Sequence, residues 1–474
     1  MELPSFRPRR ALTFFLPASA LLFSFELASG SSFGLLELSV AGLSVSLLLS
    51  VWGQFGFRPV PIARFLSMAG TGGAPLCFAA LFYLAADLLS VLYSPALRLM
   101  WEKYRVVAAL LVVAAAVSFV RGDAQLLRRT EWALAWSAPL IALATLLNYY
   151  IIRVYPMFYT LRLSLRRDYN MYATALYTAS VLGIFLSVTE WKTPLRRAAG
   201  VLFFASFSLP MIFLSGSRRI YILLPITIFV FLAVWAWREL SAEGLWKGTA
   251  VVASAVILAG VFSGALAASF QARMHSLYAA EGPAGVSGSI LGGGAAETRP
   301  EERYETVSSG SMFTKRFAIW KIALNELKTY RSAELLAGRG GGYQIVLYDD
   351  VGEELDPYYP DRDARRGTLS AHNMMLADLL DGGILKLSAE FVLLAALLMT
   401  LAPFLFRNPP MGLAYGMILG LSVVGSMVSN RYGLLYDRYF IIFAALCAAR
   451  AAQSGEEGTT AYENRHADHR SPAR

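Results

Sequence analysis

Long runs of mostly apolar residues recur along this chain and constrain its fold more than any other feature. Each run holds roughly 20 residues, the length that a helix needs to cross the hydrocarbon core of a bilayer. The chain is 56% hydrophobic and only 16% charged, so such runs fill most of its 474 residues. The short alternating segments of a membrane β-barrel do not occur in the sequence. We therefore expect an all-α polytopic membrane protein.

About 12 transmembrane helices are predicted from these runs. Their expected ranges are 11–28, 33–52, 74–94, 106–120, 132–152, 171–189, 199–214, 220–237, 249–270, 383–405, 411–428 and 435–449. The first run follows basic residues, as the apolar core of a signal peptide does, but no clean cleavage site of small residues follows it. We therefore expect an uncleaved first span.

One long connection, between the ninth and tenth spans, interrupts the predicted bundle. Its first part is rich in Gly and Ala, so we expect that part to be flexible and the second part to be helical. The predicted divisions of the chain are a transmembrane bundle of nine spans (1–270), one large periplasmic loop (271–382), the last three spans (383–450) and a disordered cytoplasmic tail (451–474).

Basic residues in the short connections predict the orientation of the chain, because Lys and Arg gather on the cytoplasmic side of membrane proteins. If the N-terminus is cytoplasmic, the connections on its side carry Arg58, Arg64, Arg121, Arg128, Arg129, Lys192, Arg196, Arg197, Arg238, Lys247 and Arg407. The net charge of +9 is therefore an orientation signal. We expect contact with membrane lipid and no binding of nucleic acid.

A second group of arginines lies on the opposite side, against this rule. The group consists of Arg153, Arg162, Arg166, Arg167, Arg218, Arg219, Arg431 and Arg438. Arginine carries a permanent charge on a planar fork that suits phosphate oxygens. Anion binding at the outer face is the simplest reason for this placement, and contact with lipid headgroups is the alternative.

The second part of the long loop contains a predicted amphipathic helix. In residues 313–331 apolar side chains recur three or four positions apart, at Phe313, Phe317, Trp320, Leu324 and Leu327. Arg316 lies one turn before Trp320, at the edge of this apolar face. A helix of this kind lies along the bilayer surface or caps the bundle.

His372 and Asn373 begin a short helix that leads into the tenth span. Histidine can accept a proton near neutral pH. With several arginines at the same face, this base suits the activation of a hydroxyl group against a phosphate leaving group. The sequence has no cluster with metal-ligand spacing, and its glycine-rich turn at residues 338–343 lacks the Lys-Ser/Thr pair of a phosphate-binding loop. We therefore expect no metal and no cofactor.

Five short motifs occur in an order that resembles the O-antigen ligase/O-antigen polymerase family. They are Gly216-Ser217-Arg218, Arg316-x-x-x-Trp320, Gly338-x-Gly340-x-x-Tyr343, His372-Asn373 and Gly382-Gly383-Ile384, and the resemblance covers roughly residues 150–400. It implies a metal-independent, inverting glycosyltransferase of the bacterial inner membrane. Such an enzyme transfers a glycan from an undecaprenyl-pyrophosphate carrier to a glycolipid or glycan acceptor at the periplasmic face.

The resemblance also implies roles for individual residues. Arg218 and Arg316 would face the pyrophosphate, and His372 would activate the acceptor. The implied substrate-binding residues are Arg219, Arg162, Arg166, Arg167, Trp320, Tyr343, Asn373 and Arg431. The segment Asn170-Met171-Tyr172 departs from the Asn-Pro-Asn of the family, and Arg219 stands where the family has a small residue.

Two questions stay open at this point. A ligase that accepts lipid A–core, a polymerase that extends carrier-linked repeat units and an enzyme that glycosylates proteins share the same donor chemistry. In a different class, Asp87 lies in the middle of a predicted span, and buried acids mark proton or ion paths in transporters and flippases. We expect Asp87 instead to form hydrogen bonds between spans or to pair with an arginine from a loop.

Overall fold

Every regular secondary-structure element in the part of the chain that the computed structural model describes is a helix. That part comprises residues 8–29, 35–55, 70–148, 164–165, 169–215, 312–351, 370–429 and 433–468, and single positions or short runs between 151 and 272. The prediction of an all-α protein is confirmed over these residues.

Seven of the described helices are long and apolar enough to cross a membrane. They are α1 (Pro8–Ser29), α4 (Gly70–Val91), α6 (Ala124–Leu147), α7 (Tyr169–Glu190), α8 (Pro194–Ser215), α16 (Met374–Arg407) and α17 (Pro409–Ser429). Inside a bilayer the backbone must satisfy its own hydrogen bonds, so long apolar segments form helices. The chain is therefore a multi-pass membrane protein.

The other described helices are α2 (Leu35–Phe55), α5 (Leu97–Phe119), α12 (Met312–Leu327), α13 (Ser332–Ala337), α14 (Tyr343–Asp350), the 3-10 turn η4 (Leu434–Tyr436) and α18 (Arg438–Asp468). The predicted spans at 220–237 and 249–270 fall largely outside the described residues. The total of about 12 spans thus stays a prediction.

The helices group into two compact units. In the first unit α7 packs against α8 and α1. The indole of Trp132 on α6 donates to Glu190 at the end of α7 over 2.6 Å, and Arg128 pairs with the same carboxylate. On the α7–α8 contact, a Cβ at Gly183 would lie 2.6 Å from the ring of Phe204, so glycine permits the close approach of the two helices.

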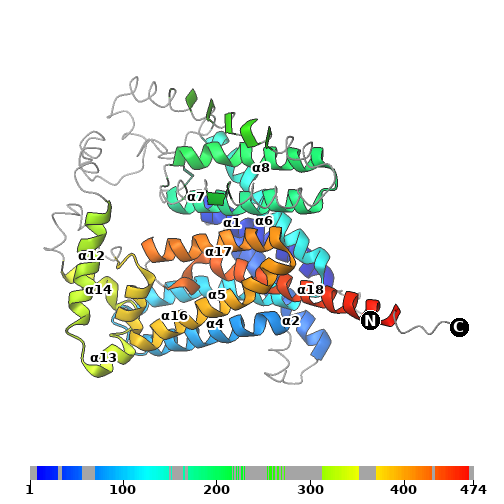
Figure 1. Ribbon diagram of the computed structural model, residues 1–474. Helices are drawn as coiled ribbons and strands as arrows, with labels where there is room; N and C mark the ends of the chain where they lie inside the picture. Colours follow the sequence, from blue (N-terminus) through cyan, green and yellow to red (C-terminus); the bar gives the residue numbers. More distant parts are fainter. Residues whose placement is uncertain are drawn as a thin grey trace, which may run out of the picture. The chain divides into compact units, whose positions relative to one another are not determined.

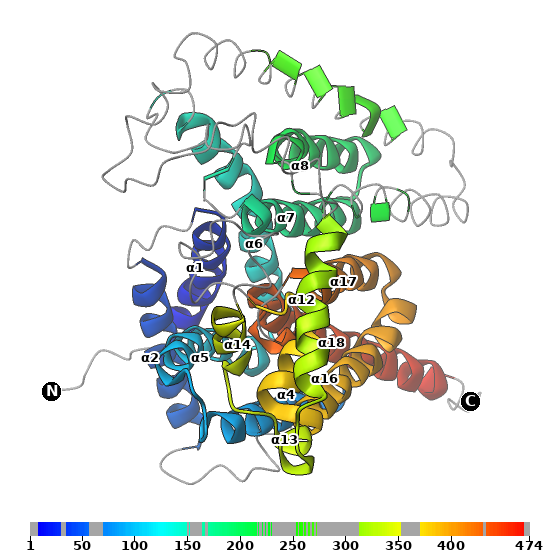
Figure 2. The ribbon, with the colours of Figure 1, turned by 90° about the vertical axis from the view of Figure 1, so that its left-hand side faces the viewer.

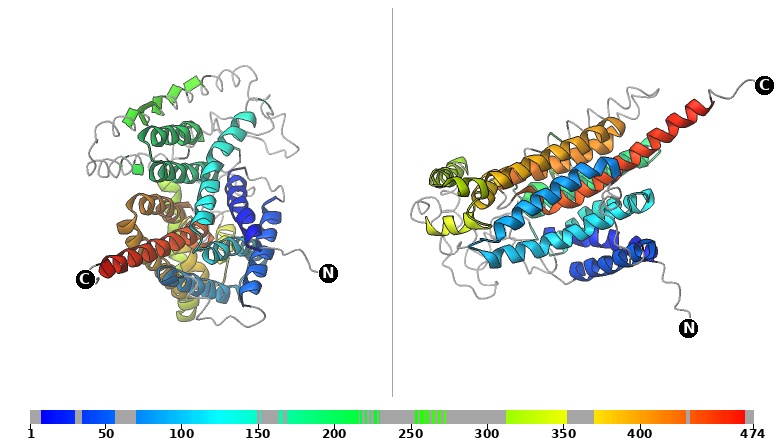
Figure 3. Two further views of the ribbon diagram at one scale, coloured as in Figure 1. Left: turned by 90° about the vertical axis from the view of Figure 1, so that its right-hand side faces the viewer. Right: turned by 90° about the horizontal axis from the view of Figure 1, so that it is seen from below.

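The second unit is built around α4, α16 and α18, which contact one another and run side by side (Figures 1 and 3). Helix α5 packs along α18. Loop residues from 307 onward belong to this unit, so the compact units do not follow the predicted division at residues 270 and 382. The short helices α12, α13 and α14 lie at the end of α16 where that helix begins (Figure 2).

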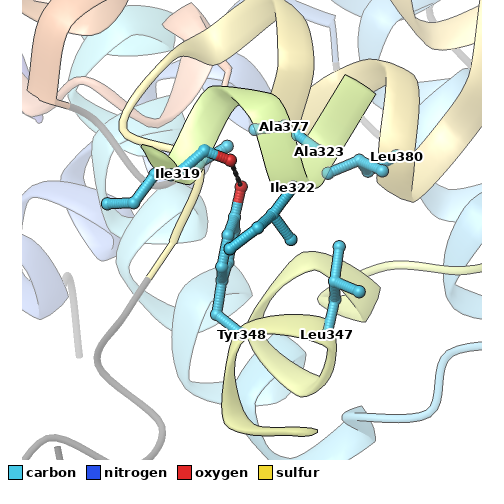
Figure 4. Packing of buried hydrophobic residues seen from close by; sticks show 8 residues of the cluster. Ile319, Ile322, Ala323, Leu347, Tyr348, Ala377 and Leu380 are labelled. Carbon is cyan, nitrogen blue, oxygen red and sulfur yellow. Dashed lines mark hydrogen bonds between the residues drawn. The ribbon is translucent and has the colours of Figure 1, made fainter. Parts of the chain in front are cut away.

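The structure confirms a helix at α12 but corrects its predicted apolar face, because Phe317 and Leu324 are 61% and 51% exposed and the neighbouring face packs on α14 and α16. The inner face of α12 contributes Ile319, Ile322 and Ala323 to a buried cluster completed by Leu347, Tyr348, Ala371, Ala377 and Leu380 (Figure 4). The hydroxyl of Tyr348 donates to the carbonyl of Ile319 over 3.0 Å. The inner face of α12 therefore packs on α14 and α16, and contact of its outer face with a bilayer stays a prediction.

The expected disorder of the tail after residue 450 is corrected by the structure. Helix α18 continues from Arg438 through Asp468 without interruption. Extending a formed helix adds one hydrogen bond for each residue fixed and needs no new nucleus, so a packed helix can carry a polar extension.

Candidate functional site

The indole of Trp320 donates a hydrogen bond to the carbonyl of Ala371 over 3.0 Å. This bond joins α12 to the residue that precedes His372, across 51 positions of the chain. Arg316 is half-buried one turn before Trp320 on the same helix. The structure thus brings two of the sequence motifs, Arg316-x-x-x-Trp320 and His372-Asn373, into one region of the second unit.

His372 has a backbone angle φ of 50° and is the one non-glycine residue with positive φ in the described part of the chain. Such a conformation is uncommon for residues with a side chain and persists where the surroundings impose it. Asn373 follows as the N-cap of α16, and its Oδ1 accepts from the backbone N–H groups of Met375 and Leu376 at 3.0 and 3.1 Å. Asn373, predicted to bind substrate, thus uses its side-chain oxygen to begin the helix.

Gln344 connects this strained turn to the first segment of α16. The backbone N–H of Ala371 donates to Gln344 Oε1 over 3.1 Å. Gln344 in turn donates to Asp381 through its backbone N–H at 3.0 Å and its Nε2 at 3.4 Å. Both side chains are buried. Sequence reasoning missed this pair; the only signal was a polar residue inside the apolar stretch that follows Tyr343.

The glycine-rich sequence at residues 338–343 forms the predicted tight turn. Gly338, Gly340 and Gly342 all have positive φ. The N–H groups of Arg339 and Gly340 donate to the carbonyls of Leu380 and Asp381 at 3.1 and 2.9 Å, so these donors are occupied by α16. The turn therefore packs backbone against backbone on α16.

Tyr343, predicted to contact substrate, lies in a polar cluster on the loop helices. Its hydroxyl donates to Glu326 over 2.7 Å and accepts from Arg339 Nη1 over 2.7 Å. The Arg339 guanidinium also pairs with Glu334 and lies 4.4 Å above the ring of Tyr330. Burial, and then the bond to Glu326, raise the pKa of the Tyr343 hydroxyl, which therefore remains a neutral donor near neutral pH. Arg339 was not predicted as a member of this region.

The remaining predicted arginines, Arg162, Arg166, Arg167, Arg218, Arg219 and Arg431, lie outside the described residues. Two neighbours of these arginines are described in the first unit. Ser217 is buried, and its hydroxyl donates to Asn170 Oδ1 over 3.0 Å. The position before Arg218 therefore contacts the start of α7, which follows the Arg166-Arg167 pair in the sequence.

Among the described residues, Asp87 pairs with two lysines inside the second unit, where an arginine from a loop was one of the expected partners. Its carboxylate lies 3.6 Å from Lys103 Nζ and 2.5 Å from Lys386 Nζ. The hydroxyls of Tyr104 and Tyr436 also donate to it. The expected hydrogen bonding between helices is confirmed, and the partner is corrected because α5 and α16 present their lysines at the same depth as Asp87.

Asp378 extends this buried cluster. It lies 3.2 Å from Lys386 Nζ and accepts a hydrogen bond from the hydroxyl of Tyr83 at 2.8 Å. Sequence reasoning missed Lys386 and Asp378. A lysine in the apolar run after Gly383 was the available signal, because a charged residue there must find a buried partner.

Among the described residues, no group of three or more His, Cys, Asp or Glu side chains is placed to hold a metal ion. No protein-family model matches the chain, and no curated protein matches it at a significant level. The family relationship therefore stays a prediction from the sequence motifs.

Proposed function

We propose that this protein transfers a glycan from an undecaprenyl-pyrophosphate carrier to an acceptor hydroxyl at the periplasmic face of the bacterial inner membrane, as an O-antigen ligase-like enzyme. The hydrogen bond from Trp320 to Ala371 is the observation that carries the proposal, because it joins the arginine motif and the histidine motif at one place. The candidate spans support a membrane-embedded enzyme.

In the proposed reaction the acceptor hydroxyl attacks the anomeric carbon of the carrier-linked sugar. The new carbon–oxygen bond forms as the bond to the phosphate oxygen breaks, and that oxygen keeps the electron pair. His372 takes the proton of the hydroxyl, and Arg316 and Arg218 stabilise the charge that grows on the pyrophosphate. Direct displacement inverts the anomeric configuration. The role of Arg218 rests on the sequence resemblance.

The rigidity of the histidine turn supports this role. Ala371 is held on its N–H by Gln344 and on its carbonyl by Trp320, and Asn373 is held as the helix cap. A catalytic base that is fixed before substrate binds loses little freedom in the transition state, which lowers the barrier to reaction.

Single substitutions test the proposal in a bacterial strain whose surface glycan depends on this gene. We expect His372→Ala and Arg316→Ala to lower transfer by about 100-fold or more, the range for loss of a catalytic base or a charge-stabilising group. Lys321→Ala is the matched control, because Lys321 is an exposed basic residue on the same helix and should leave transfer unchanged. Normal glycan length and attachment in the His372→Ala strain, with the protein present in the membrane, would contradict the proposal.

The same strains separate the alternatives. Loss of a ligase leaves glycan of normal length on the carrier, whereas loss of a repeat-unit polymerase leaves single units attached to the acceptor. A proton-coupled transporter or flippase that uses Asp87 predicts instead that Asp87→Asn abolishes glycan export while His372→Ala does not.

A further inference from the structure

Helix α16 is broken at Gly383. The proposed reaction does not use this break. Gly383 has φ 64° and ψ −161°, which divides the helix into a short segment up to Gly382 and a longer one from Ile384. A Cβ at Gly383 would lie 2.5 Å from backbone atoms of Leu336 and Gly338, so the break is packed against the end of α13. The short segment begins directly after His372 and Asn373. The short segment therefore connects the break to His372.

Lys386 bridges this break. Its ammonium lies 3.2 Å from Asp378 Oδ1, in the short segment before the break, and 2.5 Å from Asp87 Oδ1 on α4. Residues eight positions apart in a continuous helix are about 12 Å apart along its axis, and side chains meet at spacings of three or four. The pairing of Lys386 with Asp378 thus depends on the break, and in turn holds its two sides together.

The bridge is buried and anchored on a neighbouring helix. Only 1% of the Lys386 side chain is exposed, and neither Asp378 nor Asp87 is exposed. Tyr83 on α4 donates to Asp378, so the short segment is tied to α4 both directly and through Lys386. Charged groups in such surroundings hold their geometry because the loss of either partner leaves the other charge buried without compensation.

The far end of the short segment leads to the histidine turn. Asp381 lies on this segment and holds Gln344, which binds the N–H of Ala371. We propose that Lys386 is a positioning residue, which sets the tilt of the Met374–Gly382 segment through Asp378 and thereby the position of His372. The effect on transfer rests on the proposed function, whereas the effect on the position of His372 does not.

Asp378→Asn is the most direct test, because it removes one end of the bridge and leaves Lys386 paired with Asp87. Asparagine retains an oxygen that can accept from Tyr83. The full-length protein is prepared with ¹³C-labelled histidine; the chain has four histidines, and His372→Ala assigns the resonance of interest. We expect the His372 resonance to shift or broaden in Asp378→Asn and in Lys386→Met.

Lys103→Met is the matched control. It removes another buried ammonium that lies 3.6 Å from Asp87, but from α5 and not across the break in α16. We expect it to leave the His372 resonance in place. An unchanged His372 resonance in Asp378→Asn would overturn the inference, as would an equal shift in Lys103→Met. The His372 resonance of Asp378→Asn tests the positioning role even if Lys386→Met fails to accumulate in the membrane.

Transfer assays add a second readout. Displacement of a catalytic group by about 1 Å can cost on the order of 100-fold in rate, so we expect Asp378→Asn to lower kcat with little change in KM for the donor. The double variant Asp378→Asn/Lys386→Met should lose no more transfer activity than the less active single variant, because both substitutions act through one bridge. If His372→Ala retains transfer while Asp378→Asn still shifts the His372 resonance, the proposed function fails and the positioning role stands.

Discussion

Gln344 holds Asp381 from two directions, with its backbone N–H 3.0 Å from one carboxylate oxygen and its side-chain Nε2 3.4 Å from the other. The side-chain oxygen of the same glutamine accepts from the N–H of Ala371. One buried amide therefore fixes both the first segment of α16 and the turn that presents His372.

Gln344→Met keeps the size of this side chain and removes its polar atoms. We expect the free energy of unfolding to fall by about 1–3 kcal/mol, because the N–H of Ala371 and one oxygen of Asp381 lose a buried partner. Thermal unfolding of the detergent-solubilised protein measures the change. Gln453→Met is the control, since Gln453 binds the carbonyl of Arg121 at a half-buried position where water can replace it. Equal losses in the two variants would contradict the role of Gln344.

Trp320→Phe removes the indole N–H and keeps most of the apolar ring. The loss of one hydrogen bond should lower stability by about 0.5–1.5 kcal/mol. If the bond to Ala371 also positions His372, transfer should fall more than stability, by roughly tenfold or more for a displaced catalytic group. Trp101→Phe serves as the control because Trp101 is 74% exposed and should affect neither quantity. An active Trp320→Phe enzyme would show that the contact does not serve the reaction.

Gly340→Ala should destabilise the turn that packs against α16. Gly340 has φ 102°, and a Cβ there would lie 2.4 Å from the carbonyl oxygen of Tyr93. The strained backbone alone costs about 1–3 kcal/mol, and the clash adds to it. In Gly122→Ala the new Cβ meets no atom within 4 Å, so that variant should unfold at the wild-type temperature. An unchanged unfolding temperature of Gly340→Ala would mean that the turn can move away from Tyr93.

Acid should loosen α13 through Glu334. This carboxylate accepts from the N–H of Arg331 at 2.8 Å and from Arg339 at 3.1 Å, and the bond from Arg331 is the main reason that its pKa is lowered. A carboxyl whose pKa is lower in the folded state stabilises the fold above the unfolded pKa of about 4.3. That stabilisation is lost as the pH falls through the folded pKa.

Hydrogen exchange of the α13 amides between pH 6 and pH 3 measures this effect, after correction for the intrinsic pH dependence of exchange. We expect protection to decrease at the acid end in the wild-type protein. Glu334→Gln should start with lower protection and lose this part of the pH dependence. A wild-type pH profile in the glutamine variant would assign the transition to another group.

Several local features could be predicted from the sequence because they depend on neighbouring residues. Apolar runs form helices since the backbone has no other partner in a bilayer. The glycines at 338–342 mark the tight turn, because positive φ is easily reached without a side chain. The spacing of apolar residues predicts the helix α12 but not its buried face, since Phe317 and Leu324 are exposed whereas Ile319 and Ile322 are buried. The sequence also placed Asn373 at the start of a helix, where its amide oxygen caps the free N–H groups.

The partners of the buried charges were decided by the tertiary structure alone. Tyr83 and Asp378 are 295 positions apart in the chain, and Gln344 reaches Asp381 across 37. The sequence shows that a charge inside a span needs a partner, but which partner it finds depends on the depth and rotation at which the helices pack. The place of Asp87 inside a predicted span predicts contacts between helices. Its pairing with Lys103 and Lys386, and the bridge from Lys386 to Asp378 across the break in α16, follow only from the packing of α4, α5 and α16.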